Sequence, residues 1–157
     1  MIDVRDLCKS YSAAGIDVKA VDGVSFTVPE GMIFTLLGPS GCGKTTTLRS
    51  IGGLETPESG EISVSGSLVY SSTAGVCVKA KARGFGMVFQ SYAIWPHMTV
   101  FENVAFPLQV PGRKQKYTRR QIADEVGRML EIVALSGYES RRATQLSGGQ
   151  QQRLALA

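Results

Sequence analysis

The stretch GPSGCGKT, residues 38–45, constrains the fold of this chain more than any other segment. It matches the pattern G-x-x-x-x-G-K-[ST]. The apolar run MIFTLL at 32–37 precedes it and is typical of a strand buried on both faces, and a helix is predicted from Lys44 to the glycine pair at 52–53. A buried strand, a glycine-rich loop and a helix in this order predict a phosphate-binding loop in an α/β fold.

The residue types in this loop suit a bound phosphate group. Glycine at positions 41 and 43 lets the backbone adopt left-handed conformations, so that successive N–H groups converge on an anion at the helix N-terminus. Lys44 can reach the β- and γ-phosphates of a nucleotide, and the Thr45 hydroxyl can ligate Mg²⁺. The predicted nucleotide-binding residues of this stretch are Gly38, Pro39, Ser40, Gly41, Cys42, Gly43, Lys44, Thr45 and Thr46.

Strand-like segments dominate the first half of the chain. VSFTV at 24–28 and GEISVSGSLVY at 60–70 are rich in β-branched and aromatic residues between glycine and proline. GFGMVF at 84–89 is a second apolar run that favours a buried strand.

Helical patterns dominate the second half. The spacing of Thr99 with Glu102, and of Thr118 with Gln121, predicts two capping boxes at helix starts. An apolar stripe at helical spacing then runs through 122–133. Its members are Ile122, Val126, Met129, Leu130 and Val133. The stretch PGRKQKYTRR at 111–120 has the composition of a linker.

Composition excludes several other classes of protein. No run approaches the roughly 18 apolar residues of a membrane span, and the acidic N-terminus is unlike a signal peptide, which indicates a cytosolic chain. Cys8, Cys42 and Cys77 form no C-x-x-C pair, so neither a disulfide framework nor a zinc site is indicated. The net charge of +4 comes from the region after residue 110, and such a bias usually marks a solvated face rather than a nucleic-acid surface.

A second motif, LSGGQQQR at 146–153, offers another anion site. Ser147 can cap a helix with Gln150 three positions on, and the glycines at 148–149 leave backbone N–H groups bare. A glycine turn that opens a helix explains the cap, but it gives no reason for a second anion site beside a phosphate loop.

With these two motifs the chain resembles the ATP-binding cassette (ABC) ATPases over essentially its whole length. The resemblance implies an α/β fold in which residues 1–90 form an N-terminal antiparallel β subdomain together with a P-loop NTPase (RecA-like) core. A helical subdomain follows at 91–147, and the start of the signature helix at 148–157. In that family two subunits pack head to tail, and the signature of one faces the γ-phosphate held by the other. The corresponding signature residues are Leu146, Ser147, Gly148, Gly149 and Gln150.

The resemblance implies two further contacts with Mg-ATP. Gln90 lies where the family places a glutamine that touches Mg²⁺ or the attacking water, and Tyr11 lies where it stacks an aromatic ring on adenine. The family's Mg²⁺-orienting Asp, general-base Glu and switch His follow RLALA, and His97 is not that histidine. The complete protein is therefore expected to hydrolyse ATP, whereas residues 1–157 are expected to lack part of the core and to bind ATP without turnover.

The stretch 89–108 resembles the ATPase subunits of iron, polyamine and sugar importers, most nearly the ferric-iron group. This implies peripheral attachment at the inner face of the cell membrane through membrane-spanning permease subunits. Ile94, Trp95 and Pro96 are expected to meet a permease, although local packing of the helical subdomain would also explain them.

Two alternatives remain open at this stage. One is a catalytically inactive nucleotide-binding fragment or interaction module. A comparison of ATP affinity with ATP turnover would distinguish it from an active ATPase subunit. The other is a non-transport ABC ATPase acting on DNA. Such proteins carry long coiled coils or zinc modules between the two motifs, and the sequence between Gln90 and Leu146 has neither sustained heptads nor a Cys/His cluster.

Overall fold

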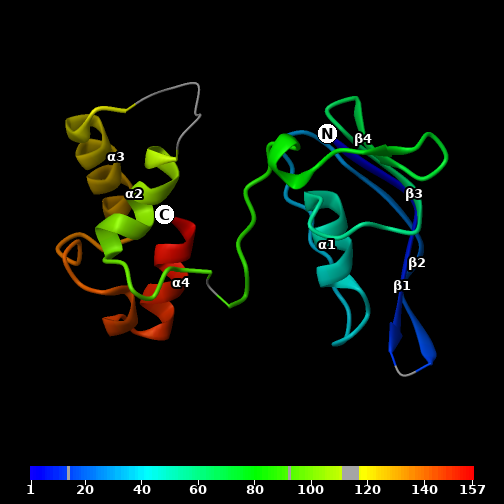
Figure 1. Ribbon diagram of the computed structural model, residues 1–157, viewed down its shortest axis with the longest axis horizontal. Coiled ribbons are helices and arrows are strands. Elements are labelled where there is room, and N and C mark those ends of the chain that lie inside the picture. Colours follow the sequence, from blue (N-terminus) through cyan, green and yellow to red (C-terminus); the bar gives the residue numbers. More distant parts are fainter. Residues whose placement is uncertain (14, 92, 111–116) are drawn as a thin grey trace. The chain divides into compact units, whose positions relative to one another are not determined.

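The computed structural model describes residues 1–13, 15–91, 93–110 and 117–157 (Figure 1). These residues form two compact units, Met1–Met87 and Val88–Ala157. The first contains a β-sheet and the helix α1, and the second contains the helices α2, α3 and α4 (Figure 1). Most of the linker predicted at 111–120 falls outside the described residues.

An antiparallel sheet with the strand order β2-β1-β3-β4-β5 makes up most of the first unit. Its elements are β1 (Ile2–Ala13), β2 (Ile16–Val28), β3 (Ser59–Val64), β4 (Ser67–Ser71) and β5 (Val76–Cys77), followed by the 3₁₀ helix η1 (Ala80–Ala82). Val4 and Leu7 of β1 and Ile62 of β3 are almost fully buried in its core. The strands predicted within 24–28 and 60–70 are confirmed.

The pairing of β1 with β2 contains a bulge that bears on the site described below. Lys9 lies opposite Val21, but the next residue, Ser10, lies opposite Lys19. Ala20 is therefore an extra residue on β2. A bulge of this kind bends the strand and re-aims nearby groups, and bulges are common next to functional sites.

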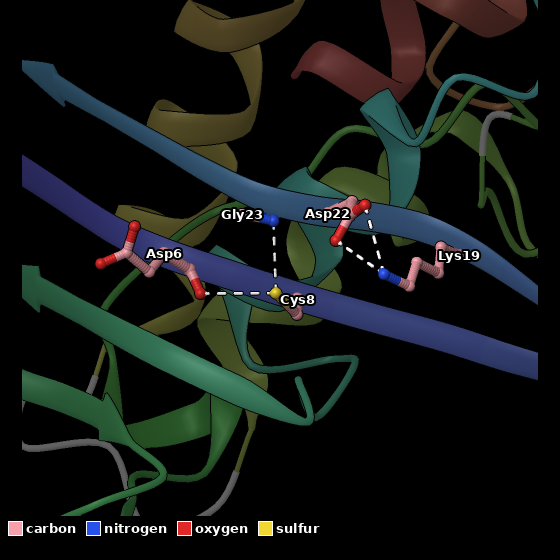
Figure 2. Close-up of polar contacts among 5 residues, drawn as sticks. All are labelled: Asp6, Cys8, Lys19, Asp22 and Gly23. Atoms are coloured by element: carbon pink, nitrogen blue, oxygen red, sulfur yellow. Dashed lines mark hydrogen bonds and ion pairs between the residues drawn. The ribbon is translucent and has the colours of Figure 1, made fainter.

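A cysteine side chain bridges another irregular part of the same strand pair (Figure 2). The Cys8 Sγ accepts a hydrogen bond from the Gly23 N–H at 3.2 Å and donates to the Asp6 carbonyl at 3.6 Å. Nearby, the Lys19 ammonium pairs with the Asp22 carboxylate at 3.3 Å (Figure 2). The two contacts of Cys8 supply partners to backbone groups where the regular ladder of backbone hydrogen bonds is interrupted.

Helix α1 (Lys44–Gly52) follows the glycine-rich loop, as predicted. It ends at Gly53, which has a left-handed backbone with φ 74°. The buried guanidinium of Arg83 donates to the carbonyls of Ser50 and Ile51 at 2.8 and 2.9 Å. A cation therefore satisfies the last turn of the helix, where carbonyl groups otherwise lack partners.

The apolar runs at 32–37 and 84–89 predict buried strands, and both predictions are wrong. Neither run pairs with another strand among the described residues, and Ile33 is 96% exposed. An apolar composition records a tendency to be buried, whereas a strand also needs a neighbour whose backbone groups pair with its own. Phe34 does find a packing partner, because its ring stacks on Phe26 at a centroid distance of 4.9 Å.

The second unit is a small helical bundle. Its elements are α2 (Val100–Gln109), α3 (Arg119–Ile132), the 3₁₀ helix η2 (Ala143–Gln145) and α4 (Gly148–Leu156). The apolar stripe predicted on α3 faces the core, with Ile122, Val126 and Leu130 buried and Met129 and Val133 partly buried against them.

All three α-helices of the second unit begin with capping boxes, as predicted. Thr99, Thr118 and Ser147 each accept a hydrogen bond from the backbone N–H three residues on, and the side chain at that position accepts one in return. These caps satisfy N–H groups that a helix leaves without internal partners.

Candidate functional site

The N-terminus of α1 differs from those of the other α-helices in the described chain. Its N-cap is Gly43, which makes no side-chain hydrogen bond, and no acidic residue lies in its first turn. The helices α2, α3 and α4 close their own first turns with side-chain oxygens. The first N–H groups of α1 are thus left to an external acceptor, and the helix dipole favours an anion there.

Gly43 is also the point where the loop presses against the sheet. A Cβ placed on it would lie 1.9 Å from the Ala20 carbonyl oxygen, and its backbone is left-handed with φ 88°. The Ala20 carbonyl in the bulge on β2 therefore lies against the end of the loop, and only glycine fits at position 43. Gly41 is likewise left-handed, with φ 83°, but a Cβ on it would meet nothing within 4 Å.

Lys44, the first residue of α1, folds back over the loop. Its Nζ donates to the carbonyls of Gly38 and Pro39 at 2.8 and 2.7 Å and lies 3.4 Å from the Cys42 Sγ. The ammonium is thus held above the same loop whose N–H groups surround the helix N-terminus. These carbonyls are neutral acceptors, so an anionic oxygen at this position would form a stronger, charge-assisted bond with Lys44.

The predicted residues of this loop are mostly open to solvent. Lys44, Gly43 and Thr46 are half-buried. The others are exposed: Gly38, Pro39, Ser40, Gly41, Cys42 and Thr45. An exposed glycine-rich loop that leads into an uncapped helix N-terminus, with a cation held above it, is chemically suited to bind a polyphosphate.

Tyr11 lies on the hairpin that carries the bulge. It is 41% exposed and pairs with Val18, two residues before Ala20 on β2. Two residues of a strand span about 7 Å, so the backbone partner of Tyr11 lies about this far along β2 from the bulge that Gly43 meets. The structure thus places Tyr11 on the same strand pair that the glycine-rich loop contacts.

The residues at this loop fit a magnesium ion that arrives with a nucleotide. Mg²⁺ usually keeps few protein ligands and takes the rest from phosphates and water. The exposed Thr45 supplies one hydroxyl oxygen at the helix N-terminus. No cluster of three or more His, Cys, Asp or Glu side chains suited to a metal is present in the described ranges.

An apolar cavity of about 550 Å³ adjoins the start of α1 within the first unit. Lys44 and Thr45 lie on its wall, together with apolar side chains such as Phe26, Leu48 and Phe85. None of the side chains that line it is a carboxylate. A cavity of this character can hold apolar groups.

The second motif opens α4 in the second unit. Leu146 is buried in the helical core, whereas Ser147, Gly148 and Gly149 are exposed. The side chain of Gln150 returns to the cap, where its Oε1 accepts the Ser147 N–H at 2.9 Å. The motif therefore has a buried anchor followed by an exposed helix N-terminus.

Gln90 is exposed and belongs to the second unit, whereas the loop at 38–45 belongs to the first. Its predicted contact with Mg²⁺ or water therefore stays a prediction. The functional division of the chain at residues 90 and 147 also stays a prediction.

An aromatic surface lies on the second unit beside a cleft of about 190 Å³. Trp95 is 46% exposed, packs on Phe106 at a centroid distance of 5.7 Å and lines the cleft together with Ile94. The Asn103 side chain holds the backbone of Trp95 in place, because it accepts the Trp95 N–H at 2.7 Å and donates to the Trp95 carbonyl at 3.1 Å. Pro96 is exposed next to Trp95.

Comparison with known proteins decides the family. The sequence model of a family described as "ABC transporter" matches residues 21–157. The chain belongs to the ABC transporter family. This membership confirms the family that the two motifs predict.

Relatives within the ABC transporter family are named as importer subunits. The chain is 51% identical over 99% of its length to the spermidine/putrescine import ATP-binding protein PotA of Acidothermus cellulolyticus. It is 47% identical over 89% of its length to the trehalose/maltose import ATP-binding protein MalK of Thermococcus litoralis. It is 43% identical over 99% of its length to the sulfate/thiosulfate import ATP-binding protein CysA of Pseudomonas syringae pv. tomato. The chain spans 38%, 37% and 45% of these relatives, respectively.

Solved structures agree with the α/β fold class. The dimeric post-hydrolysis structure of the ATP-binding cassette MJ0796 bound to ADP and Pi superposes with a TM-score of 0.86 at 28% identity. The match covers 99% of this chain and 67% of that one. A second dimeric structure of MJ0796, described as a bacterial ABC transporter cassette, gives a TM-score of 0.83 at 30% identity.

Three structural features of the site were not predicted from the sequence. They are the Ala20 carbonyl that receives Gly43, the Asn103 side chain that fixes the Trp95 loop, and the Lys9 ammonium 5.3 Å from the centre of the Tyr11 ring. Lys9 and Tyr11 are two residues apart on a strand and so lie on the same face. This spacing is the signal in the sequence that could have suggested the contact of Lys9 with the Tyr11 ring.

Proposed function

We propose that this chain binds Mg-ATP as part of the ATP-binding subunit of an ABC importer, and that the complete protein couples ATP hydrolysis to solute uptake. One observation carries the proposal: the N-terminus of α1 has no cap of its own, and Lys44 lies across the loop in front of it. The names of the relatives support the importer class.

The residues of the chain have distinct parts in this function. Backbone N–H groups of the loop and α1 bind the phosphates, and Lys44 exchanges its carbonyl acceptors for phosphate oxygens. Thr45 would give Mg²⁺ one ligand, and a bound metal would supply positive charge beside the phosphate oxygens. Gln90 is proposed to touch the metal or the attacking water.

Two partners complete the proposed assembly. A second copy would place its exposed α4 N-terminus, at Ser147, Gly148 and Gly149, over the γ-phosphate, and the dimeric MJ0796 structures support a dimer. A permease subunit would dock at Trp95 and the cleft beside it, which would hold the protein at the inner face of the membrane. No helix in the described ranges is long and apolar enough to cross a membrane.

The transported solute is left open by this proposal. The relatives named above import polyamines, a disaccharide and sulfate or thiosulfate, so their names do not single out one solute. Import of ferric iron therefore stays a prediction.

Calorimetric titration with Mg-ATP tests the proposal. Lys44→Ala removes a charge-assisted donor, so we expect ATP affinity to fall by about 10- to 150-fold, which corresponds to about 1.5–3 kcal/mol. Lys19→Ala, which removes a lysine already paired with Asp22, is the matched control and should leave affinity close to that of the unaltered chain. Equal ATP affinity in the Lys44→Ala variant and the unaltered chain would refute the assignment of the loop.

A further inference from the structure

A lysine occupies an unusual position beneath the exposed aromatic ring of β1. The Lys9 Nζ lies 5.3 Å from the centre of the Tyr11 ring and 3.3 Å from the Glu55 Oε1. The Lys9 side chain is only 18% exposed, and that of Glu55 is 24% exposed. Lysine side chains usually keep the ammonium in water, so a lysine held between a ring and a carboxylate indicates a specific role.

The ion pair connects the ring to the helix that follows the phosphate-binding loop. Glu55 lies three residues after the last residue of α1, and its N–H donates to the Arg49 carbonyl in the last turn of that helix at 3.2 Å. The Lys9–Glu55 pair therefore ties β1 to the C-terminal end of α1.

The other end of α1 meets the same hairpin. Its N-cap, Gly43, contacts the Ala20 carbonyl, and the Ala20 bulge lies opposite Lys9 and Ser10. Both ends of the helix thus contact the strand pair that carries Lys9 and Tyr11.

We propose that Lys9 is a positioning residue for the base of the bound nucleotide. Its ammonium occupies one face of the Tyr11 ring through a cation–π contact and leaves the other face for a purine. A ring that is already held loses less side-chain freedom when a base stacks on it, so the site binds ATP more tightly. This inference rests on the proposed function, because it concerns the same nucleotide.

The test compares two ligands that share phosphates but differ in the base. Affinities for Mg-ATP and for inorganic tripolyphosphate with Mg²⁺ are measured on the full chain and on Lys9→Met. We expect Lys9→Met to weaken ATP binding by about three- to tenfold and to leave tripolyphosphate binding unchanged. Lys9→Arg keeps a cation over the ring and should restore ATP affinity, and Lys19→Met, a lysine of the same hairpin that is paired with Asp22, is the matched control.

A double-mutant cycle identifies the ring as the route of the effect. In a Tyr11→Ala background, Lys9→Met should weaken ATP binding no further, because there is no ring to position. If circular dichroism shows that Lys9→Met does not fold, Glu55→Gln takes its place, and it should weaken ATP binding without affecting tripolyphosphate.

Three results would overturn this inference but not the proposed function. They are an unchanged ATP affinity in Lys9→Met, an equal loss of affinity for ATP and tripolyphosphate in Lys9→Met, or an effect of Lys9→Met that persists in the Tyr11→Ala background. Absence of ATP binding by the unaltered chain would instead refute the proposed function, and the inference with it.

Discussion

Alanine substitutions at two glycines of the loop separate backbone conformation from contact with the sheet. Gly41 and Gly43 both have left-handed backbones, with φ 83° and 88°, so alanine at either costs about 1–2 kcal/mol for conformation. Only at Gly43 would the new Cβ collide with backbone, 1.9 Å from the Ala20 carbonyl oxygen. Such overpacking adds about 1–3 kcal/mol, because either α1 or the bulge on β2 must move.

Urea unfolding measured by far-UV circular dichroism checks this difference. With slopes of about 1–3 kcal/mol per molar urea, Gly43→Ala should unfold at a midpoint lower than that of Gly41→Ala by about 1 M. Since a domain is stabilised by only about 5–15 kcal/mol, Gly43→Ala alone can remove much of the stability of the first unit. Equal midpoints for the two variants would show that the loop does not press on Ala20 and would refute the reasoning.

Three further predictions concern other contacts of the chain. Arg83→Met removes the donor to the buried Ile51 carbonyl and one of two donors to the Ser50 carbonyl, so it should destabilise the chain by about 1–3 kcal/mol in the same urea assay, with unaltered stability as the contrary result. Mg-ATP should slow the alkylation of Cys42 more than that of Cys8 and Cys77, because bound phosphates would cover the loop that carries Cys42. Mass spectrometry measures the alkylation of each thiol, and equal protection of all three would contradict the prediction. Hydrogen bonds from the Thr99 N–H and hydroxyl hold the pKa of Glu102 in the folded chain below its ordinary value. Glu102 therefore stabilises the fold at pH values above its pKa in the unfolded chain. This stabilisation is lost as the pH falls through the lowered pKa of the folded chain. The stability difference between the unaltered chain and Glu102→Gln should shrink over that acidic range, and a pH-independent difference would contradict it.

Local signals in the sequence predicted the helices well. The capping boxes at Thr99, Thr118 and Ser147 and the glycine stop at 52–53 are confirmed, because caps depend on residues only a few positions apart. The loop at 38–45 was predictable for the same reason, since its shape follows from glycines at fixed spacing.

Features that depend on distant partners were not predictable. The run at 32–37 is as apolar as a buried strand, yet the structure gives it no paired neighbour, and composition does not encode pairing. The contact of Gly43 with Ala20 depends on a bulge, which a one-residue shift in register creates. The cation over Tyr11 depends on Glu55, far along the chain, to hold Lys9 in place.

The cap on α4 raises a question about the proposed dimer, because Ser147 already has a partner within its own helix. Its hydroxyl oxygen accepts the Gln150 N–H at 3.4 Å. A serine hydroxyl has two acceptor lone pairs and one O–H donor, so accepting this bond leaves the donor free. Ser147 can therefore donate to the γ-phosphate on a second copy without giving up the cap. The contrast with α1 follows from the same chemistry. A helix that binds phosphate through its first N–H groups, as proposed for α1, must leave those groups uncapped. A helix that contributes a serine hydroxyl, as proposed for α4, can keep its cap and remain ordered before the second copy binds.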